Sequence, residues 1–147
     1  MKPTGFFLVA VFMGVLSAAV PLPGSGNPLA GSNGDSSLLG HWHGDSVCAV
    51  PESACHDEES LYHVSRLAEK PGWFSLKGDK IVDGKAVSMG TVECRYESDK
   101  QTLTCESPRG VFNFTVKNSR MIGTMNLPDG SLWRKISLSK VDPKHGE

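Results

Sequence analysis

Apolar and polar residues alternate in short runs from about residue 40 onward, and Gly, Pro, Asn and Asp residues separate these runs roughly every eight to twelve positions. In this region we find no helical period that persists beyond about two turns. The pattern therefore predicts an all-β protein. The predicted strands cover residues 41–49, 60–67, 73–77, 87–96, 102–106, 111–117, 120–127 and 131–140.

The turns between these strands are short, which predicts an antiparallel up-and-down meander. A meander of roughly eight strands leaves its two outer strands unpaired unless the sheet closes on itself. We therefore expect a small barrel. The interior of such a barrel is just wide enough to be filled by side chains or to take one small ligand.

The alternation also assigns residues to the interior of this barrel. In the segment 111–116, Phe112 and Phe114 alternate with polar residues, so both phenylalanines are expected to point inward. Met125 lies on the inner face of the segment 121–127 by the same argument. The candidate ligand-binding residues are Trp42, Tyr62, Phe112, Phe114, Met125 and Arg134.

Arg134 stands out because the alternation along residues 131–139 places it on the apolar inner face, while Trp133 is expected on the outer face. A buried guanidinium without a partner costs several kcal/mol. An indole face is a favourable partner for a guanidinium. Because the first and last strands become neighbours when the barrel closes, we expect Arg134 to contact Trp42.

The first residues of the chain have the pattern of a signal peptide. Lys2 precedes an apolar run at residues 5–16, which is too short to span a bilayer, and small residues precede a cleavage point after Ala19. An uncleaved anchor is the alternative. The prediction is a signal peptide at residues 1–19 and a mature chain that is secreted or periplasmic, without stable insertion in a membrane.

The rest of the chain divides into a spacer and one domain. Residues 20–37 are rich in Gly, Ser and Pro and hold few large apolar groups, which is typical of a flexible linker. Residues 38–147 are long enough for one β-barrel domain and too short for two.

The domain contains four cysteines, and export would place them in an oxidising compartment. Cys94 and Cys105 are equidistant from a polar turn, so they are expected to pair across a hairpin. Cys48 and Cys55 are then left to close a short loop. A zinc site is the alternative, but neither pair has the spacing of a zinc ribbon.

Charge argues against some classes of partner. The whole chain has a net charge of −1; the first 19 residues hold one Lys and no acid, so their removal leaves 14 basic and 16 acidic side chains. The basic residues are scattered through the domain. We therefore expect no nucleic-acid partner and no binding to an anionic membrane surface.

Histidines suggest one kind of chemistry. His41 and His43 are two residues apart, so on a strand they point to the same side and could chelate zinc or copper. His56 or His63 could supply a third ligand. The simpler interpretation is that these groups are solvated on the outer face, because a metal site needs three well-placed ligands. We predict no metal and no other cofactor.

Hydrolytic chemistry has little support in the sequence. No serine lies in a Gly-x-Ser-x-Gly motif, and no cysteine is expected to be a free thiol. The adjacent acids Asp57, Glu58 and Glu59 could act as an acid and base pair, but such a run beside a disulfide is usually a solvated loop. We therefore expect a protein that is not an enzyme.

Two short stretches resemble known proteins. Gly40-His41-Trp42 resembles the Gly-x-Trp motif on the first strand of lipocalins and other calycins, in which the tryptophan packs on an arginine of the last strand, here Arg134. Residues 48–62 and 123–136 are similar to segments of small exported bacterial proteins of unknown function. These resemblances imply an exported barrel. Small secreted or periplasmic protease inhibitors use a similar barrel.

Three hypotheses of function follow. The first is a non-enzymatic binding protein that holds a small apolar ligand inside the barrel. The second is a protein-binding module, such as an inhibitor, acting through Trp133 and the segment before Leu38. The third is a metal-binding protein that uses His41 and His43. An apolar cavity of well over ~100 Å³ would favour the first over the second. The sequence leaves the oligomeric state open.

Overall fold

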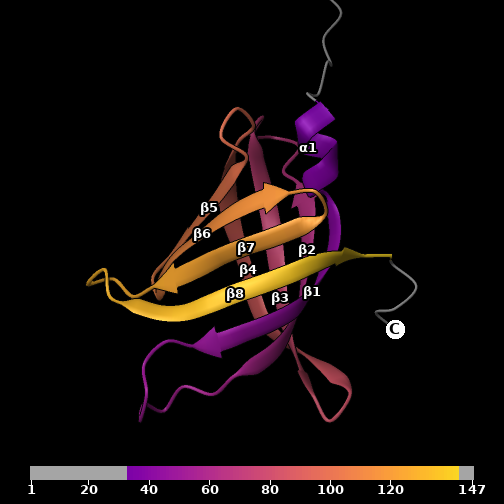
Figure 1. Ribbon diagram of the computed structural model, residues 1–147. Coiled ribbons are helices and arrows are strands. Elements are labelled where there is room, and N and C mark those ends of the chain that lie inside the picture. The colour runs from indigo at the N-terminus through magenta and orange to yellow at the C-terminus, as the bar shows by residue number, and fades with distance from the viewer. Residues whose placement is uncertain (1–32, 143–147) are drawn as a thin grey trace, which may run out of the picture. The chain divides into compact units, whose positions relative to one another are not determined.

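The computed structural model describes residues 33–142. A short helix, α1 (Asn33–Leu38), precedes eight strands (Figure 1). Within residues 33–142, no helix is long and apolar enough to cross a bilayer. The predicted signal peptide and the first part of the predicted linker lie outside the described residues. The strands are β1 (Gly40–Cys48), β2 (Glu58–Arg66), β3 (Trp73–Val82), β4 (Lys85–Glu97), β5 (Thr102–Ser107), β6 (Gly110–Lys117), β7 (Arg120–Asn126) and β8 (Leu132–Val141).

The eight strands close into a barrel, as the sequence predicts. Each strand pairs antiparallel with the next one, and β8 returns to pair with β1. The predicted bounds agree with the structure to within two residues except in β3, which extends five residues beyond the prediction toward the turn that it shares with β4. Asp83 and Gly84 form this turn with positive φ angles of 51° and 74°. The two strands continue into it as a long hairpin (Figure 1).

The strand alternation sets which side chains are buried. In β6, Phe114 and Val116 are buried while Asn113 and Thr115 are exposed. Burial of a large apolar side chain contributes about 1.5–3 kcal/mol relative to its exposure. The core cluster draws on all eight strands. Its largest fully buried members are Trp42, Phe74, Phe114, Leu38, Leu103 and Met121.

The end of the barrel where β1 begins is closed by α1 (Figure 1). Leu38 is fully buried, and its carbonyl accepts a hydrogen bond of 2.9 Å from Trp42 Nε1. The Ser37 carbonyl accepts a bond of 2.6 Å from Lys140 Nζ, and Asp35 pairs with Arg66 at 3.1 Å. The end of the segment predicted as a linker, from residue 33, is therefore helical and packs on the barrel.

Both predicted disulfides are confirmed. Cys94 and Cys105 are direct partners in the β4–β5 register, and Cys48–Cys55 closes the loop between β1 and β2. All four cysteines are thus paired. Disulfides of this kind persist in oxidising environments, so the pairing is consistent with an extracellular or periplasmic protein.

Candidate functional site

A cavity of about 480 Å³ lies at the end of the barrel opposite α1. It is lined by residues from the second half of β1, β5 and β7 and the first half of β2, β6 and β8, which meet at this end because neighbouring strands are antiparallel. Residues from the middle of β3 and β4 complete the lining. The wall is mainly apolar. Its apolar side chains include Tyr62, Leu76, Met89, Val92, Phe112, Met125 and Trp133. The barrel is therefore packed at one end and hollow at the other.

Four of the six predicted ligand-binding residues line this cavity: Tyr62, Phe112, Met125 and Arg134. Phe114 does not line it. Its ring stacks on that of Phe112 with the ring centres 6.1 Å apart, and it forms an edge contact with Tyr62 with the ring centres 6.2 Å apart. Phe114 therefore packs against two of the lining rings. Trp42 lies in the packed core beside Leu38 and takes no part in the cavity.

Two β-bulges bring further side chains to the cavity. Gly78 pairs with Gly90 and Asp79 with Ser88, which leaves Met89 as the extra residue in β4. In β8, the pairing skips Trp133 in the same way. Bulges re-aim side chains and are common beside functional sites. Met89 and Trp133 both line the cavity.

The expectation that Trp133 faces outward is therefore wrong. The side chain is half-buried and packs against the core cluster. Strict alternation assigned it to the outer face, but the bulge adds one residue to β8 at this point and moves Trp133 to the inner side. The signal that sequence analysis missed is a local break in the period of two.

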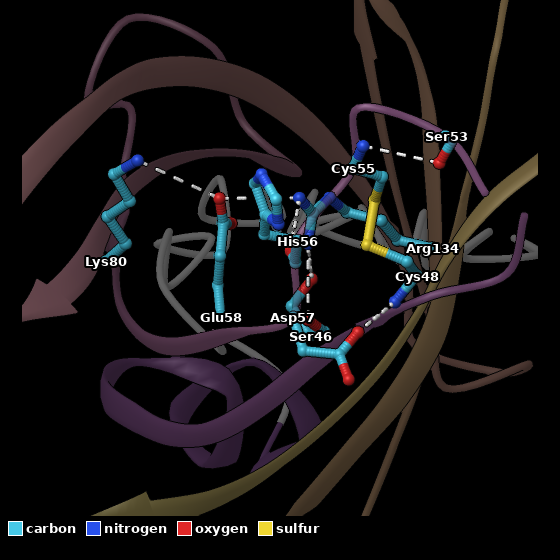
Figure 2. A network of polar contacts seen from close by, with 9 residues as sticks. All are labelled: Ser46, Cys48, Ser53, Cys55, His56, Asp57, Glu58, Lys80 and Arg134. Atoms are coloured by element: carbon cyan, nitrogen blue, oxygen red, sulfur yellow. Dashed lines mark hydrogen bonds and ion pairs between the residues drawn. A yellow bond between two sulfur atoms is a disulfide. The ribbon is translucent and has the colours of Figure 1, made fainter. Parts of the chain in front are cut away.

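Arg134 is a polar residue of the cavity wall. It lies at the centre of the network of polar contacts in Figure 2. Its guanidinium pairs with Glu58 at 3.3 Å and donates to the carbonyl of Ser46 at 3.2 Å and to that of His56 at 3.0 Å. Lys80 approaches the same Glu58 oxygen at 3.9 Å. The Arg134 side chain is only 13% exposed, so the opposite charge of Glu58 offsets its desolvation.

The predicted contact between Arg134 and Trp42 is wrong. Both residues face the barrel interior, but Trp42 pairs with Lys140 and Arg134 pairs with Cys48 in the β1–β8 register. The two sites are therefore six residues apart along the seam, which is about 20 Å at ~3.3 Å per residue. Lys140 takes the place expected for the arginine, with Nζ 5.6 Å from the centre of the Trp42 ring.

The Cys48–Cys55 loop holds the acidic segment against this network. The backbone N–H of Cys48 donates to Asp57 Oδ1 at 2.8 Å, which places the neighbouring His56 carbonyl beside Arg134 (Figure 2). Asp57, Glu58 and Glu59 take three different partners. Glu59, on the outside, accepts from His43 at 2.6 Å. The three acids do not converge on one point.

Tyr62 supplies a neutral polar group to the cavity wall. Burial raises the pKa of its hydroxyl to about 12. The hydroxyl therefore stays protonated across the physiological range. It can donate a hydrogen bond to a bound molecule without adding charge to the apolar wall.

His41, His43 and His63 lie on the outer face of the barrel and take part in two separate pairs. His63 Nδ1 and His41 Nε2 are 3.1 Å apart, and His43 pairs with Glu59. The backbone carbonyl of His56 belongs to the Arg134 network. Among residues 33–142, no three His, Cys, Asp or Glu side chains are grouped in a way that could hold a metal ion. The structure therefore brings together only pairs of the proposed ligands.

The sequence matches no protein-family model, and no curated protein is similar to it.

Proposed function

We propose that this protein is a non-enzymatic binding protein that holds a small apolar ligand in the hollow end of a lipocalin-like barrel. One observation carries the proposal: a mainly apolar cavity of about 480 Å³ lies in a barrel whose other end is tightly packed. Sites for small molecules commonly occupy about 300–1,000 Å³ and are lined by apolar and aromatic side chains with a few polar groups.

The state of the polar groups supports binding over catalysis. Arg134 and Glu58 are engaged with each other, and the Tyr62 phenol is neutral. The cavity wall is thus mainly apolar, with a neutralised ion pair, the neutral phenol and a few further polar side chains: Ser46, Thr91, Ser107 and Arg109. Such a wall favours a ligand with an apolar body and a small polar group that accepts a hydrogen bond.

Export is part of the proposal. We propose that residues 1–19 are a signal peptide cleaved after Ala19, and that the mature protein is secreted or periplasmic. The two disulfides support this location. A ligand would then be taken up outside the cytoplasm.

Native mass spectrometry of the untagged protein purified from its own source tests this function. The expected result is a population carrying one small apolar molecule per chain, which is released when the protein is denatured. A protein that carries no such molecule, and that takes up none from a panel of apolar compounds, would contradict the proposal.

A further inference from the structure

The first half of β4 has an open edge. Strand β4 pairs with β3 from Lys85 to Arg95, but it pairs with β5 only from Cys94 to Glu97. Residues 85–92 therefore have a strand partner on one side alone. Within the described part of the chain, no backbone hydrogen bond from another segment reaches the opposite side. Backbone N–H and C=O groups on that side are free to pair with an added strand.

This edge has little of the usual protection against pairing. Edge strands are commonly blunted by charged residues or proline. Residues 85–92 contain one charged side chain, Lys85, and no proline. Val87 is 43% exposed and Met89 36% exposed, so apolar groups accompany the open backbone. The bulge at Met89, beside Gly90 with its positive φ of 113°, interrupts the regular strand near its middle.

The open edge borders the cavity directly. Met89 and Val92 of β4 line the cavity, as do Pro108 and Arg109 of the turn after β5. Side chains of an extended peptide point alternately to opposite faces. A peptide added along residues 85–92 could thus direct one apolar side chain into the cavity while its backbone pairs with β4.

Charge at the opening favours an acidic partner. The Arg109 side chain is exposed, and it has no ion-pair partner among the described residues. The nearby carboxylate of Glu58 is already engaged by Arg134 and Lys80. Arg109 is therefore free to pair with a carboxylate of a bound molecule.

We propose that residues 85–92 of β4 receive an extended peptide segment of a partner protein by strand addition, with one apolar side chain in the cavity and an acidic residue beside Arg109. The inference rests on the proposed function in one respect, namely that the cavity accepts an apolar group. It adds a second kind of occupant, an extended segment of a partner protein, and the way in which that segment is held.

Backbone-methylated peptides test the strand addition. The probe is a blocked heptapeptide of alternating Thr and Leu that ends in Asp, titrated into the full-length mature protein by calorimetry. Two isomers carry N-methyl groups on alternate residues, so that either one edge or the other loses its donors. Because an added strand bonds β4 through one edge, one isomer should bind at least about tenfold more weakly than the other. Equal binding of the two isomers would overturn the proposal.

Arg109→Gln tests the acidic contact. This variant should weaken binding of the Asp peptide about fivefold or more and leave an otherwise identical Asn peptide unchanged. Lys117→Gln is the matched control, because it removes one positive charge at the end of β6 away from the cavity. It should change neither affinity. Equal effects of the two variants would overturn the role of Arg109.

Binding of an apolar dye, compared with binding of the peptide, distinguishes the strand addition from the proposed function. If the dye binds in the cavity but no peptide binds, the strand addition is wrong and the proposed function stands. If neither binds, both are wrong. If sedimentation shows a dimer whose amides at residues 85–92 are protected from exchange, the occupant is a second copy of the chain, and the proposal of a partner peptide fails.

Discussion

Trp42 and Lys140 lie directly opposite each other at the seam where β1 meets β8, with the ammonium 5.6 Å from the centre of the indole ring. The indole is fully buried, and its N–H donates to Leu38 in α1. Lys140 also donates to the Ser37 carbonyl. Trp42 and Lys140 thus connect the β1–β8 seam, where the barrel closes, to the helix α1.

Replacing Trp42 should therefore be costly. Trp42→Ala is expected to lower the free energy of unfolding by about 3–5 kcal/mol, because it removes a fully buried aromatic side chain at the seam. The double variant His41→Ser/His43→Ser should lower it by less than about 1 kcal/mol, since its contacts are on the outer surface. Urea unfolding measures both. Similar losses in the two variants would contradict the central position of Trp42.

The Arg134 network predicts a second stability effect. Arg134→Met should cost about 2–4 kcal/mol, because it leaves Glu58 without its nearest cation and two backbone carbonyls without their donor. Lys70→Gln is a suitable control. It removes a half-exposed ion pair with Glu93 and should cost less than about 1 kcal/mol. Thermal and urea unfolding should rank the two variants in this order.

Stability should also depend on pH through His63. Its pKa is lowered from the ordinary value of 6.5, first by burial and then by the positive charges of His41 and Lys77. The folded state then binds fewer protons than the unfolded state just below pH 6.5, so stability falls as the pH falls through this window. His63→Gln should reduce this slope. An unchanged slope in unfolding measured between pH 7 and 5 would show that another group is responsible.

Removal of either disulfide should lower stability, but only removal of Cys48–Cys55 should also weaken ligand binding. Replacing either pair by serine should cost about 2–4 kcal/mol of stability. His56 and Asp57 follow the Cys48–Cys55 loop directly; the His56 carbonyl accepts from Arg134, and Asp57 accepts from the backbone N–H of Cys48. Removal of Cys48–Cys55 should therefore weaken ligand binding as well, whereas removal of Cys94–Cys105 should leave the affinity unchanged at a temperature where the barrel is folded. Equal affinities in the two variants would argue against a role for the loop in the site.

Much of this fold can be predicted from the sequence because the strands and turns depend on local residue patterns. The period of two and the turn residues predict eight strands, and the cysteine spacing around a hairpin predicts the pairing of Cys94 with Cys105. The same alternation assigns Phe112 and Met125 to the inner face, and the structure shows both at the cavity together with the predicted Tyr62.

The remaining features depend on geometry that a local pattern does not contain. The stagger between β1 and β8 decides that Trp42 meets Lys140 and not Arg134. The bulge in β8 turns Trp133 inward against the alternation. The size of the cavity depends on the number of large side chains at each end of the barrel. That distribution in turn depends on the stagger between the strands.

The most direct test of the central claim is a change in cavity volume. A Cβ at Gly78 would lie 3.4 Å from Tyr62 Cε1 and 3.6 Å from Met89 Cε, so a larger side chain there would extend among the lining residues without a backbone clash. Gly78→Leu should thus fill the cavity. Thr115→Leu, on the exposed outer face of β6, adds a leucine elsewhere and is the control.

Titration with an apolar fluorescent dye measures the outcome, after circular dichroism has shown that both variants are folded. The wild-type protein and Thr115→Leu should bind one dye molecule per chain with equal affinity, and Gly78→Leu should bind it at least about tenfold more weakly, because the space for the ligand is lost. Undiminished binding by a folded Gly78→Leu variant, or no binding by the wild-type protein, would contradict the account.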